Sequence, residues 1–302
     1  MDKAQIISKL ENIVGSENVR LDESMIEHTT FDIGGPADIY VIPQTEEEVA
    51  QLVRTLRADD VSFRVVGYGS DLLVADEGLR CVVIQINKNL SEITIEGTTI
   101  HAQAGASNGA VARAALAAGL TGYEPESGIP GTIGGAAIMN AGAYGGEFKD
   151  VAVSLQCVNP EGEIVTVTAE EADWSYRHSM MNDAGYVILS ATLELREGDP
   201  AEIEALMADL KQKREDKQPL DMPSAGSTFK RPEGYFAGKL IQDAGLRGYS
   251  VGGAQVSEKH TGFVVNRGGA TAADVMQLIA DVQKRVHDEF GVMLEPEVRI
   301  WK

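Results

Sequence analysis

Short strand-like runs alternate with helical segments along the whole chain, a pattern typical of α+β or α/β layers. Residues 45–57, TEEEVAQLVRTLR, place apolar side chains at helical spacing and open with a capping-box pattern from Thr45 to Glu48. Residues 271–291 repeat this pattern from Thr271 to Asp274. The sequence predicts helices over both segments, and Gly291 is a plausible end of the second.

Strand patterns surround a further Ala-rich helix, and a Pro-Glu-Gly turn at residues 160–162 predicts a hairpin. After the strand pattern YVILSATLELRE, the residue pattern changes to that of a charged helix, which begins near Pro200 and ends before Pro219. We therefore expect a domain boundary near residue 197. The expected domains are residues 1–196 and residues 197–302. The first is expected to consist of two subdomains, about 1–75 and 76–196.

Length and composition indicate an ordinary globular protein, since 302 residues that are 43% hydrophobic are enough for two packed domains. The first twenty residues contain charges and no long apolar run, so we expect neither a secretory signal nor a membrane anchor, and a cytoplasmic location. Cys81 and Cys157 each lie in an apolar strand pattern, which predicts buried reduced thiols and no metal site.

The charge distribution favours small anionic ligands over nucleic acid or an anionic membrane. The formal net charge is -20, which opposes a polyanionic partner. Residues 211–267 nevertheless hold ten Lys and Arg against six acidic residues, a local balance of +4. This basic segment fits either a small anionic ligand or ordinary surface charge.

Two glycine-rich stretches are candidate ligand loops. In VGYGSDLL, Gly67 and Gly69 follow a strand and allow a nest of backbone N–H groups that, with the Ser70 hydroxyl, could hold a phosphate. Residues 127–147, SGIPGTIGGAAIMNAGAYGGE, contain seven glycines and four alanines, which permits close approach of the backbone to a ligand. Together the stretches suit a diphosphate-containing cofactor. A tight strand-to-loop turn in the first stretch, and Gly–Ala packing between closely approaching elements in either stretch, remain alternatives.

Eight motifs in order resemble the UDP-N-acetylenolpyruvoylglucosamine reductases, FAD-dependent enzymes of bacterial peptidoglycan synthesis. They are TTFDIGGPADIYVIP, VGYGSDLLV, SGIPGTIGGAAIMNAGAYGGE, WSYRHS, PSAGSTFKRP, AGKLIQDAGLRG, GGAQVSEKHTGFVVN and LEPEVRIW, and they cover residues 29–301. The resemblance implies an α+β fold: a two-part FAD-binding region of the vanillyl-alcohol-oxidase type and a smaller substrate-binding domain. The last strand of the substrate-binding domain could return to the FAD-binding region.

The resemblance also implies ligands and their contact residues. It implies non-covalent FAD, NADPH as co-substrate and UDP-N-acetylglucosamine enolpyruvate as substrate. The cofactor-binding candidates are Gly67, Tyr68, Gly69, Ser70, Asp71, Leu72, Gly128, Ile129, Gly131, Thr132, Gly134, Gly135 and Asn140. The substrate-binding candidates are Tyr144, Lys217, Lys230, Gln255 and His260.

Three catalytic roles follow by matching the family motifs. Arg177 in YRHS and Glu295 in LEPE match the residues that stabilise an enolate-like intermediate, and Ser227 in AGSTF matches the proton donor. A fixed guanidinium stabilises negative charge that develops on the substrate carboxylate. Because Glu295 would itself be an anion there, our hypothesis is that it is protonated in the reduced complex, since burial raises a carboxyl pKa, and that it donates a hydrogen bond.

Two features distinguish this chain within the family. Arg177 and Ser227 are only 50 positions apart, so the chain resembles the shorter form that lacks an insertion carrying a lid tyrosine. Asp71 stands where many relatives have Asn, which fits a diphosphate only if its carboxylate points away to cap a backbone amide. The alternatives are a flavoprotein oxidase of the same cofactor fold and a non-catalytic nucleotide-sugar binding module.

Overall fold

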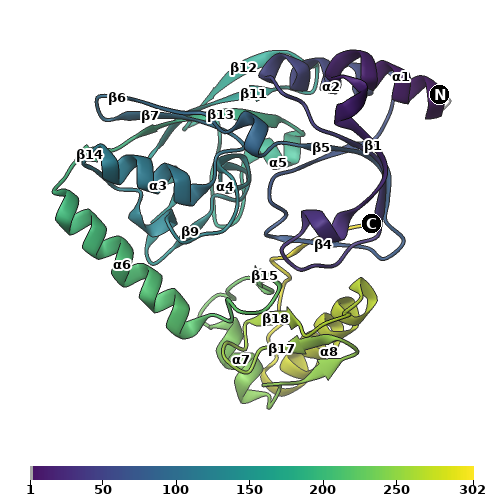
Figure 1. Ribbon diagram of the computed structural model, residues 1–302. Coiled ribbons are helices and arrows are strands. Elements are labelled where there is room, and N and C mark those ends of the chain that lie inside the picture. Colours follow the sequence, from purple (N-terminus) through teal and green to yellow (C-terminus); the bar gives the residue numbers. More distant parts are fainter. Residues whose placement is uncertain (1–2) are drawn as a thin grey trace. The chain divides into compact units, whose positions relative to one another are not determined.

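The computed structural model describes residues 3–302, which divide into two units (Figure 1). The first unit contains the described residues up to Leu21, Ile39–Tyr68 and Cys81–Gln212. The second contains Asp22–Asp38, Gly69–Arg80 and Lys213–Lys302. The VGYGS loop is thus divided between the units after Tyr68, and the domain boundary expected near residue 197 stays a prediction.

A five-stranded sheet organises the first unit, in the order β12 (Ile164–Thr168), β11 (Ala152–Val158), β13 (Val187–Glu194), β7 (Thr99–Gln103) and β6 (Ile93–Glu96). All neighbouring strands are antiparallel. The predicted hairpin joins β11 to β12, and Gly162 adopts φ 83° in its turn. Figure 1 shows α3 (Asn108–Ala117) and α4 (Ile133–Met139) along one face of this sheet.

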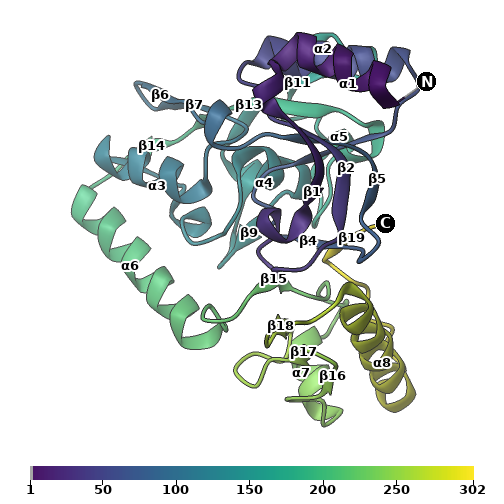
Figure 2. The ribbon, with the colours of Figure 1, turned by 45° about the vertical axis from the view of Figure 1, so that its right-hand side comes forward.

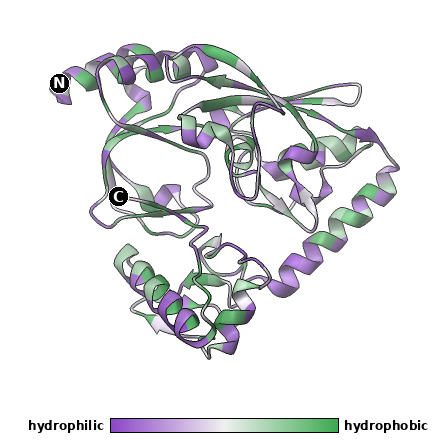
Figure 3. Cartoon of the chain, turned by 180° about the vertical axis from the view of Figure 1, so that it is seen from behind, coloured by the Kyte–Doolittle hydropathy of each residue, from purple (hydrophilic) through white to green (hydrophobic). Residues whose placement is uncertain are grey.

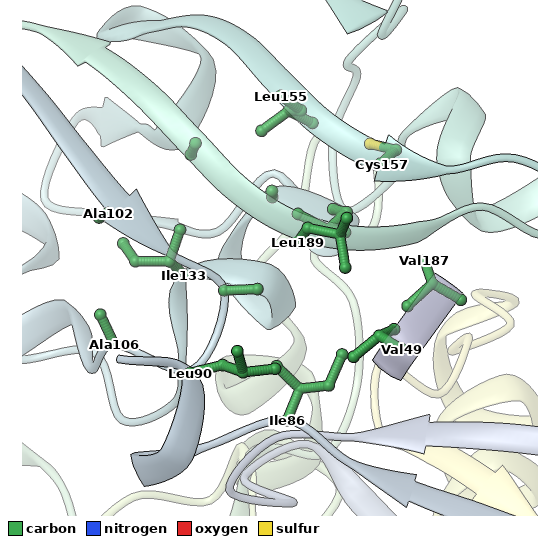
Figure 4. Close-up of a cluster of buried hydrophobic side chains, with 14 of the residues drawn as sticks. Val49, Ile86, Leu90, Ala102, Ala106, Ile133, Leu155, Cys157, Val187 and Leu189 are labelled. Carbon is green, nitrogen blue, oxygen red and sulfur yellow. The ribbon is translucent and has the colours of Figure 1, made fainter. Parts of the chain in front are cut away.

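The core of the first unit joins the sheet to its helices. Figure 4 shows Leu155 and Cys157 of β11, Leu189 of β13 and Ile133 of α4 among the buried side chains of this cluster. Helix α2 (Glu46–Ala58) adds Val49, Leu52, Val53 and Leu56, all buried as its spacing predicts. The Thr45 hydroxyl accepts from the backbone N–H of Glu48, but the Glu48 carboxylate accepts from Gln44, so only half of the predicted capping box forms.

The two cysteines are free thiols inside strands, as expected, but differ in burial. Cys157 is buried in β11, whereas Cys81 is only half-buried. The prediction for Cys81 is wrong in this respect, because it lies near the start of β5 (Leu79–Gln85) beside the exposed Arg80.

A second four-stranded sheet has the order β1 (Val19–Ser24), β2 (Pro36–Val41), β5 and β3 (Phe63–Val66). Strands β3 and β5 are parallel. The remaining elements with residues in the first unit are α1 (Lys3–Val14), β8 (Leu120–Thr121), β9 (Gly142–Ala143), β10 (Gly146–Glu147), α5 (Met180–Ala184), β14 (Arg196–Glu197), α6 (Pro200–Lys217), and the 3-10 helices η1 (Ser16–Asn18), η3 (Lys88–Leu90), η4 (Glu124–Glu126) and η5 (Phe148–Asp150).

The second unit contains another four-stranded antiparallel sheet, in the order β15 (Ser224–Ser227), β18 (Phe263–Asn266), β17 (Ala254–Val256) and β16 (Ser250–Val251). Helices α7 (Ala237–Asp243) and α8 (Ala272–Phe290), labelled in Figure 2, accompany it, and η2 (Met25–His28) belongs to the same unit. Hydrophobic and hydrophilic segments alternate along α8 in Figure 3, and its apolar face is buried. The Thr271–Asp274 capping box and the left-handed Gly291 cap are confirmed.

The chain ends in the second unit. Strand β19 (Arg299–Trp301) pairs in parallel with β4 (Leu72–Val74), which directly follows the VGYGS loop. Beyond β4, the Asp76 carboxylate accepts the first backbone N–H groups of α8, from Ala272 at 2.7 Å and Ala273 at 2.9 Å. The segment that follows the VGYGS loop is therefore hydrogen-bonded to two C-terminal elements, β19 and the start of α8. Among residues 3–302, no helix has the length and apolar character needed to cross a membrane.

The Asp76 contact predicts a measurable contribution to stability. Asp76→Ala removes two acceptors from a helix N-terminus, so we expect the free energy of unfolding to fall by about 1–2 kcal/mol in urea titrations. Asp288→Ala, at the exposed far end of α8, is the matched control and should change it by less than about 0.5 kcal/mol. Equal losses for the two variants would contradict a capping role for Asp76.

Candidate functional site

The two glycine-rich stretches meet in the first unit, where Gly67 contacts Thr132. Gly67 directly follows β3, and Thr132 caps α4 by accepting from the backbone N–H of Gly135. A Cβ at Gly67 would lie well inside 3.0 Å of the Thr132 Oγ1 atom, a separation that real Cβ atoms essentially never show. A side chain at residue 67 would force the Thr132 side chain to shift, so glycine permits this close approach of the two loops.

Backbone N–H groups at this junction are open to a ligand. Within the part of the chain that the structure describes, the amides of Gly67, Tyr68, Gly128 and Gly131 donate no hydrogen bond. Open N–H groups on two adjoining loops are the donor set that phosphate oxygens need.

Gly134 has a different role from Gly128 and Gly131. Its N–H donates to the carbonyl oxygen of Ala104 at 2.8 Å, and a Cβ there would lie 3.0 Å from the Ala104 side chain. The Gly–Ala packing alternative therefore describes Gly134. Its predicted cofactor contact stays a prediction, as does that of Gly135.

The other half of the VGYGS loop lies in the second unit. Gly69 has φ 60°, and a Cβ there would collide with the carbonyl oxygen of His28. Its carbonyl oxygen accepts from the N–H of Thr30 at 3.2 Å. Thr30 also exchanges hydrogen bonds with Ser224, whose N–H donates to the Thr30 carbonyl oxygen and whose carbonyl oxygen accepts from the Thr30 hydroxyl. Thr30 thus connects the loop to β15, the strand that ends at Ser227.

The residues after the loop are placed by backbone pairing. The carbonyl oxygen of Asp71 accepts from the N–H of Arg299 at 3.0 Å, and the Leu72 side chain is buried in β4. A cofactor contact by Leu72 would therefore come from its backbone.

Ser227, Lys230 and Glu295 are brought together in the second unit. The left-handed Gly226 precedes Ser227, which is half-buried at the end of β15. Three residues further on, the N–H of Lys230 donates to the carbonyl oxygen of Glu295 at 2.9 Å. The Lys230 ammonium lies 3.6 Å from the Glu295 carboxylate. Ser227, the proton-donor candidate, therefore lies three residues from a chain segment that pairs with Glu295, the carboxylate candidate.

The Glu295 carboxylate is exposed in the protein alone. Its side chain is 74% exposed, because pairing with the chain near Lys230 uses the backbone of Glu295 and leaves the carboxylate in solvent. Burial in the reduced complex would therefore have to come from the bound ligands, and the hypothesis for that complex stays a prediction.

Arg177 lies in the first unit and is held by backbone oxygens. Its guanidinium donates to the carbonyl oxygen of Gly142 at 3.0 Å and reaches that of Asn140 at 3.5 Å. The ring of Tyr176 lies 4.9 Å from the guanidinium carbon, and Arg177 itself has φ 56°. These contacts hold the cation in one orientation.

The segment around Arg177 completes the C-terminal end of α4. The Trp174 indole N–H donates to the carbonyl oxygen of Ala137 at 2.7 Å, and the Ser179 hydroxyl donates to that of Ile138 at 2.8 Å. These side chains give the last carbonyls of α4 partners from outside the helix, and the carbonyl oxygen of Ala137 also accepts from the Asn140 N–H at 3.4 Å. The sequence does not predict these roles, because they follow from three-dimensional contact.

Asn140 also connects the end of α4 to the segment around Arg177. It is fully buried and left-handed at the end of α4, and its side-chain N–H groups donate to the Glu147 carboxylate at 3.0 Å and the Ser175 carbonyl oxygen at 3.1 Å. Its side-chain oxygen accepts from the N–H of Lys149. Both of its donor hydrogens are used inside the protein, so Asn140 positions the Arg177 segment, and its cofactor contact stays a prediction.

The predicted substrate residues differ in exposure. Tyr144 is 43% exposed at the turn between β9 and β10, whereas Gln255 is buried and donates to the carbonyl oxygen of Gly248. Burial lowers the pKa of His260, and the nearby charges of Arg247 and Lys217 lower it further. His260 is therefore neutral near pH 7, beside two cations of the basic segment. No group of three or more potential metal ligands occurs among the described residues.

Comparison with known proteins identifies the class and then the family. Residues 37–168 match the family model "FAD binding domain", and residues 218–301 match "UDP-N-acetylenolpyruvoylglucosamine reductase, C-terminal domain". The chain therefore carries an FAD-binding domain followed by a reductase-specific domain. This confirms the expected α+β fold class.

Relatives that align with most of this chain carry the same family name. The UDP-N-acetylenolpyruvoylglucosamine reductase of Agathobacter rectalis is 55% identical over 92% of each chain, and that of Alkaliphilus metalliredigens is 49% identical over 99% of each. The crystal structure of the Thermus caldophilus reductase superimposes with a TM-score of 0.81 at 35% identity, covering 94% of this chain and 98% of that one. The chain belongs to the UDP-N-acetylenolpyruvoylglucosamine reductase family.

The contact at Gly67 gives a direct test of the loop junction. Gly67→Ala forces a Cβ against Thr132, so we expect the free energy of unfolding to fall by about 1–3 kcal/mol. Gly135→Ala is the matched control, because its Cβ would lie 3.6 Å from the same Thr132 atom inside a helix. That variant should be neutral or more stable by up to about 1 kcal/mol. Urea denaturation of both proteins that shows no difference would contradict the required close approach.

Proposed function

We propose that this protein uses FAD and NADPH to reduce UDP-N-acetylglucosamine enolpyruvate to UDP-N-acetylmuramate, a step of peptidoglycan precursor synthesis. The observation that carries the proposal is the junction at Gly67 and Thr132, with open N–H groups on both loops, in a chain of this family. The cytoplasm is the proposed location.

The first unit is proposed to hold the FAD diphosphate. The amides of Gly67 and Tyr68 on one loop and of Gly128 and Gly131 on the other would donate to its oxygens. Gly69 and Ser70 continue the first loop. When bound and reduced by NADPH, the flavin supplies the hydride that adds to C3 of the enolpyruvyl ether.

Arg177 is proposed to stabilise the negative charge that then spreads from C2 onto the substrate carboxylate. Two carbonyl oxygens already fix its guanidinium, so little reorganisation is needed when the charge develops. Planar donors of this kind match a carboxylate better than an ammonium would.

Ser227 is proposed to deliver the proton to C2. A serine hydroxyl is a weak acid, so it needs cations near the oxygen charge that remains. Lys230 is placed in the same local framework by the backbone pairing with Glu295, and Lys217 is a second candidate. Glu295 would donate a hydrogen bond to the intermediate once ligands cover it.

The basic residues of the second unit are proposed to receive the anionic groups of the substrates. The charges of Lys217 and Arg247 both lower the pKa of His260, so these two cations lie near the same imidazole. Such cations offset the repulsion expected from a net charge of -20.

Anaerobic stopped-flow absorbance tests the proposal. NADPH should bleach the bound flavin, and only the enolpyruvyl sugar should restore it. Ser227→Ala should leave bleaching intact and slow restoration by about 10²–10⁴-fold, whereas the exposed Ser250→Ala should restore normally. Restoration by oxygen alone would favour an oxidase, and a protein that binds no flavin would contradict the proposal.

A second pair of variants tests the role of Glu295. Glu295→Gln keeps a hydrogen-bond donor, so we expect it to retain at least about tenfold more restoration rate than Glu295→Ala. Equal rates for the two variants would contradict donation by a protonated Glu295.

A further inference from the structure

Glu126 is a buried carboxyl group that the proposed chemistry does not use. It ends η4, immediately before the glycine-rich stretch, and only 1% of the residue is exposed. Its Oε1 atom is buried and makes no hydrogen bond to any residue that the structure describes. An acidic side chain in such a place is costly when ionised and far less so when it carries its proton.

The charged groups around Glu126 do not compensate for ionisation. Burial raises the pKa of Glu126 to about 8; its own backbone amide opposes this shift, and the charges of Asp150 and Glu124 add to it. Tyr123, which precedes η4, is buried and donates to the side-chain oxygen of Asn108 on α3. The one charged residue of α3, Arg113, is exposed.

The cations on the neighbouring elements have other partners. Lys149 on η5 pairs with Glu147 of β10 at 2.7 Å. Arg177 donates to backbone carbonyl oxygens. The surroundings of the Glu126 carboxyl group therefore favour its neutral form.

The hairpin formed by β9 and β10 passes close to this carboxyl group, next to Pro125. A Cβ added at Gly146 of β10 would lie 2.7 Å from the side chain of Pro125 and 3.4 Å from Oε1 of Glu126. Gly146 pairs with Ala143, and the preceding Gly142 provides the carbonyl oxygen that accepts from Arg177. One short hairpin thus contacts Glu126 on one strand and Arg177 on the other.

We propose that the neutral carboxyl group of Glu126 is a positioning element for Arg177. The hairpin 142–147 rests on it, and loss of the proton places a negative charge beneath the hairpin. The hairpin then moves to admit water to the carboxylate, and the Gly142 carbonyl oxygen no longer fixes the guanidinium. The catalytic part of this inference rests on the function proposed for Arg177, whereas the contact between hairpin and carboxyl group does not.

Hydrogen exchange of the backbone amides in residues 142–147 tests the contact without substrate. In the purified flavin-bound protein, protection corrected for the intrinsic exchange rate should fall at least tenfold as the pH rises through about 8. Glu126→Gln keeps the shape of the neutral acid and cannot ionise, so its protection should stay constant from pH 6 to 9.5. The same loss of protection in Glu126→Gln would overturn the proposal.

Asp150→Asn is the matched charge variant. Asp150 is exposed and accepts from the N–H of Glu147, and asparagine keeps an acceptor oxygen there. Because the Asp150 charge raises the pKa of Glu126, this variant should keep the transition but move its midpoint to lower pH. An unchanged midpoint would overturn the electrostatic assignment. If Glu126→Gln does not fold, Asp150→Asn and wild type still decide the question.

The link to Arg177 is tested by flavin re-oxidation with the enolpyruvyl sugar. Its maximal rate should fall above about pH 8 in wild type and stay level in Glu126→Gln, while bleaching by NADPH is unaffected in both. If the exchange transition depends on Glu126 but the two rate profiles coincide, the hairpin does not control Arg177 and the proposal is overturned. Failure of the proposed function itself would appear differently, as no re-oxidation at any pH.

Discussion

The close contact between Gly67 and Thr132 is the constraint on which the candidate cofactor site depends. It joins the end of β3 to the start of α4, and any side chain at residue 67 would displace the side chain of Thr132. Once the loops adjoin, the N–H groups of Gly128 and Gly131 lie on the same framework as those of Gly67 and Tyr68. The glycines that accomplish this are separated by some sixty positions in the sequence, so tertiary packing creates the site.

Each unit also builds its own part of the chemistry. In the first, the segment around Arg177 completes the C-terminal end of α4, so the helix capped by Thr132 also supports the Arg177 guanidinium, the candidate for stabilising the intermediate. In the second, Thr30 connects the Gly69 loop to the strand of Ser227. Ligand loops and reactive groups are therefore fastened to the same elements, which restricts their movement relative to one another within each unit.

Local sequence patterns predicted the local structure well. The Thr271–Asp274 capping box and the buried face of α2 follow from spacing alone, because both depend on neighbours within one helix turn or two. Features set by distant contacts were missed: the half-burial of Cys81 and the internal hydrogen bonds of Asn140. The resemblance selected the candidate site residues, but their supporting partners needed three-dimensional contacts. Glu126 shows this limit of sequence-based prediction most clearly, because a single acidic residue before a glycine-rich stretch gives no sign that it is buried.

The two loops joined at Gly67 are proposed to hold the FAD diphosphate, and a crystal structure of the flavin-bound protein would test this placement. The diphosphate oxygens should lie about 2.7–3.2 Å from the backbone nitrogens of Gly67 or Tyr68 on one loop and of Gly128 or Gly131 on the other. A diphosphate bound elsewhere, with those amides still open, would contradict it.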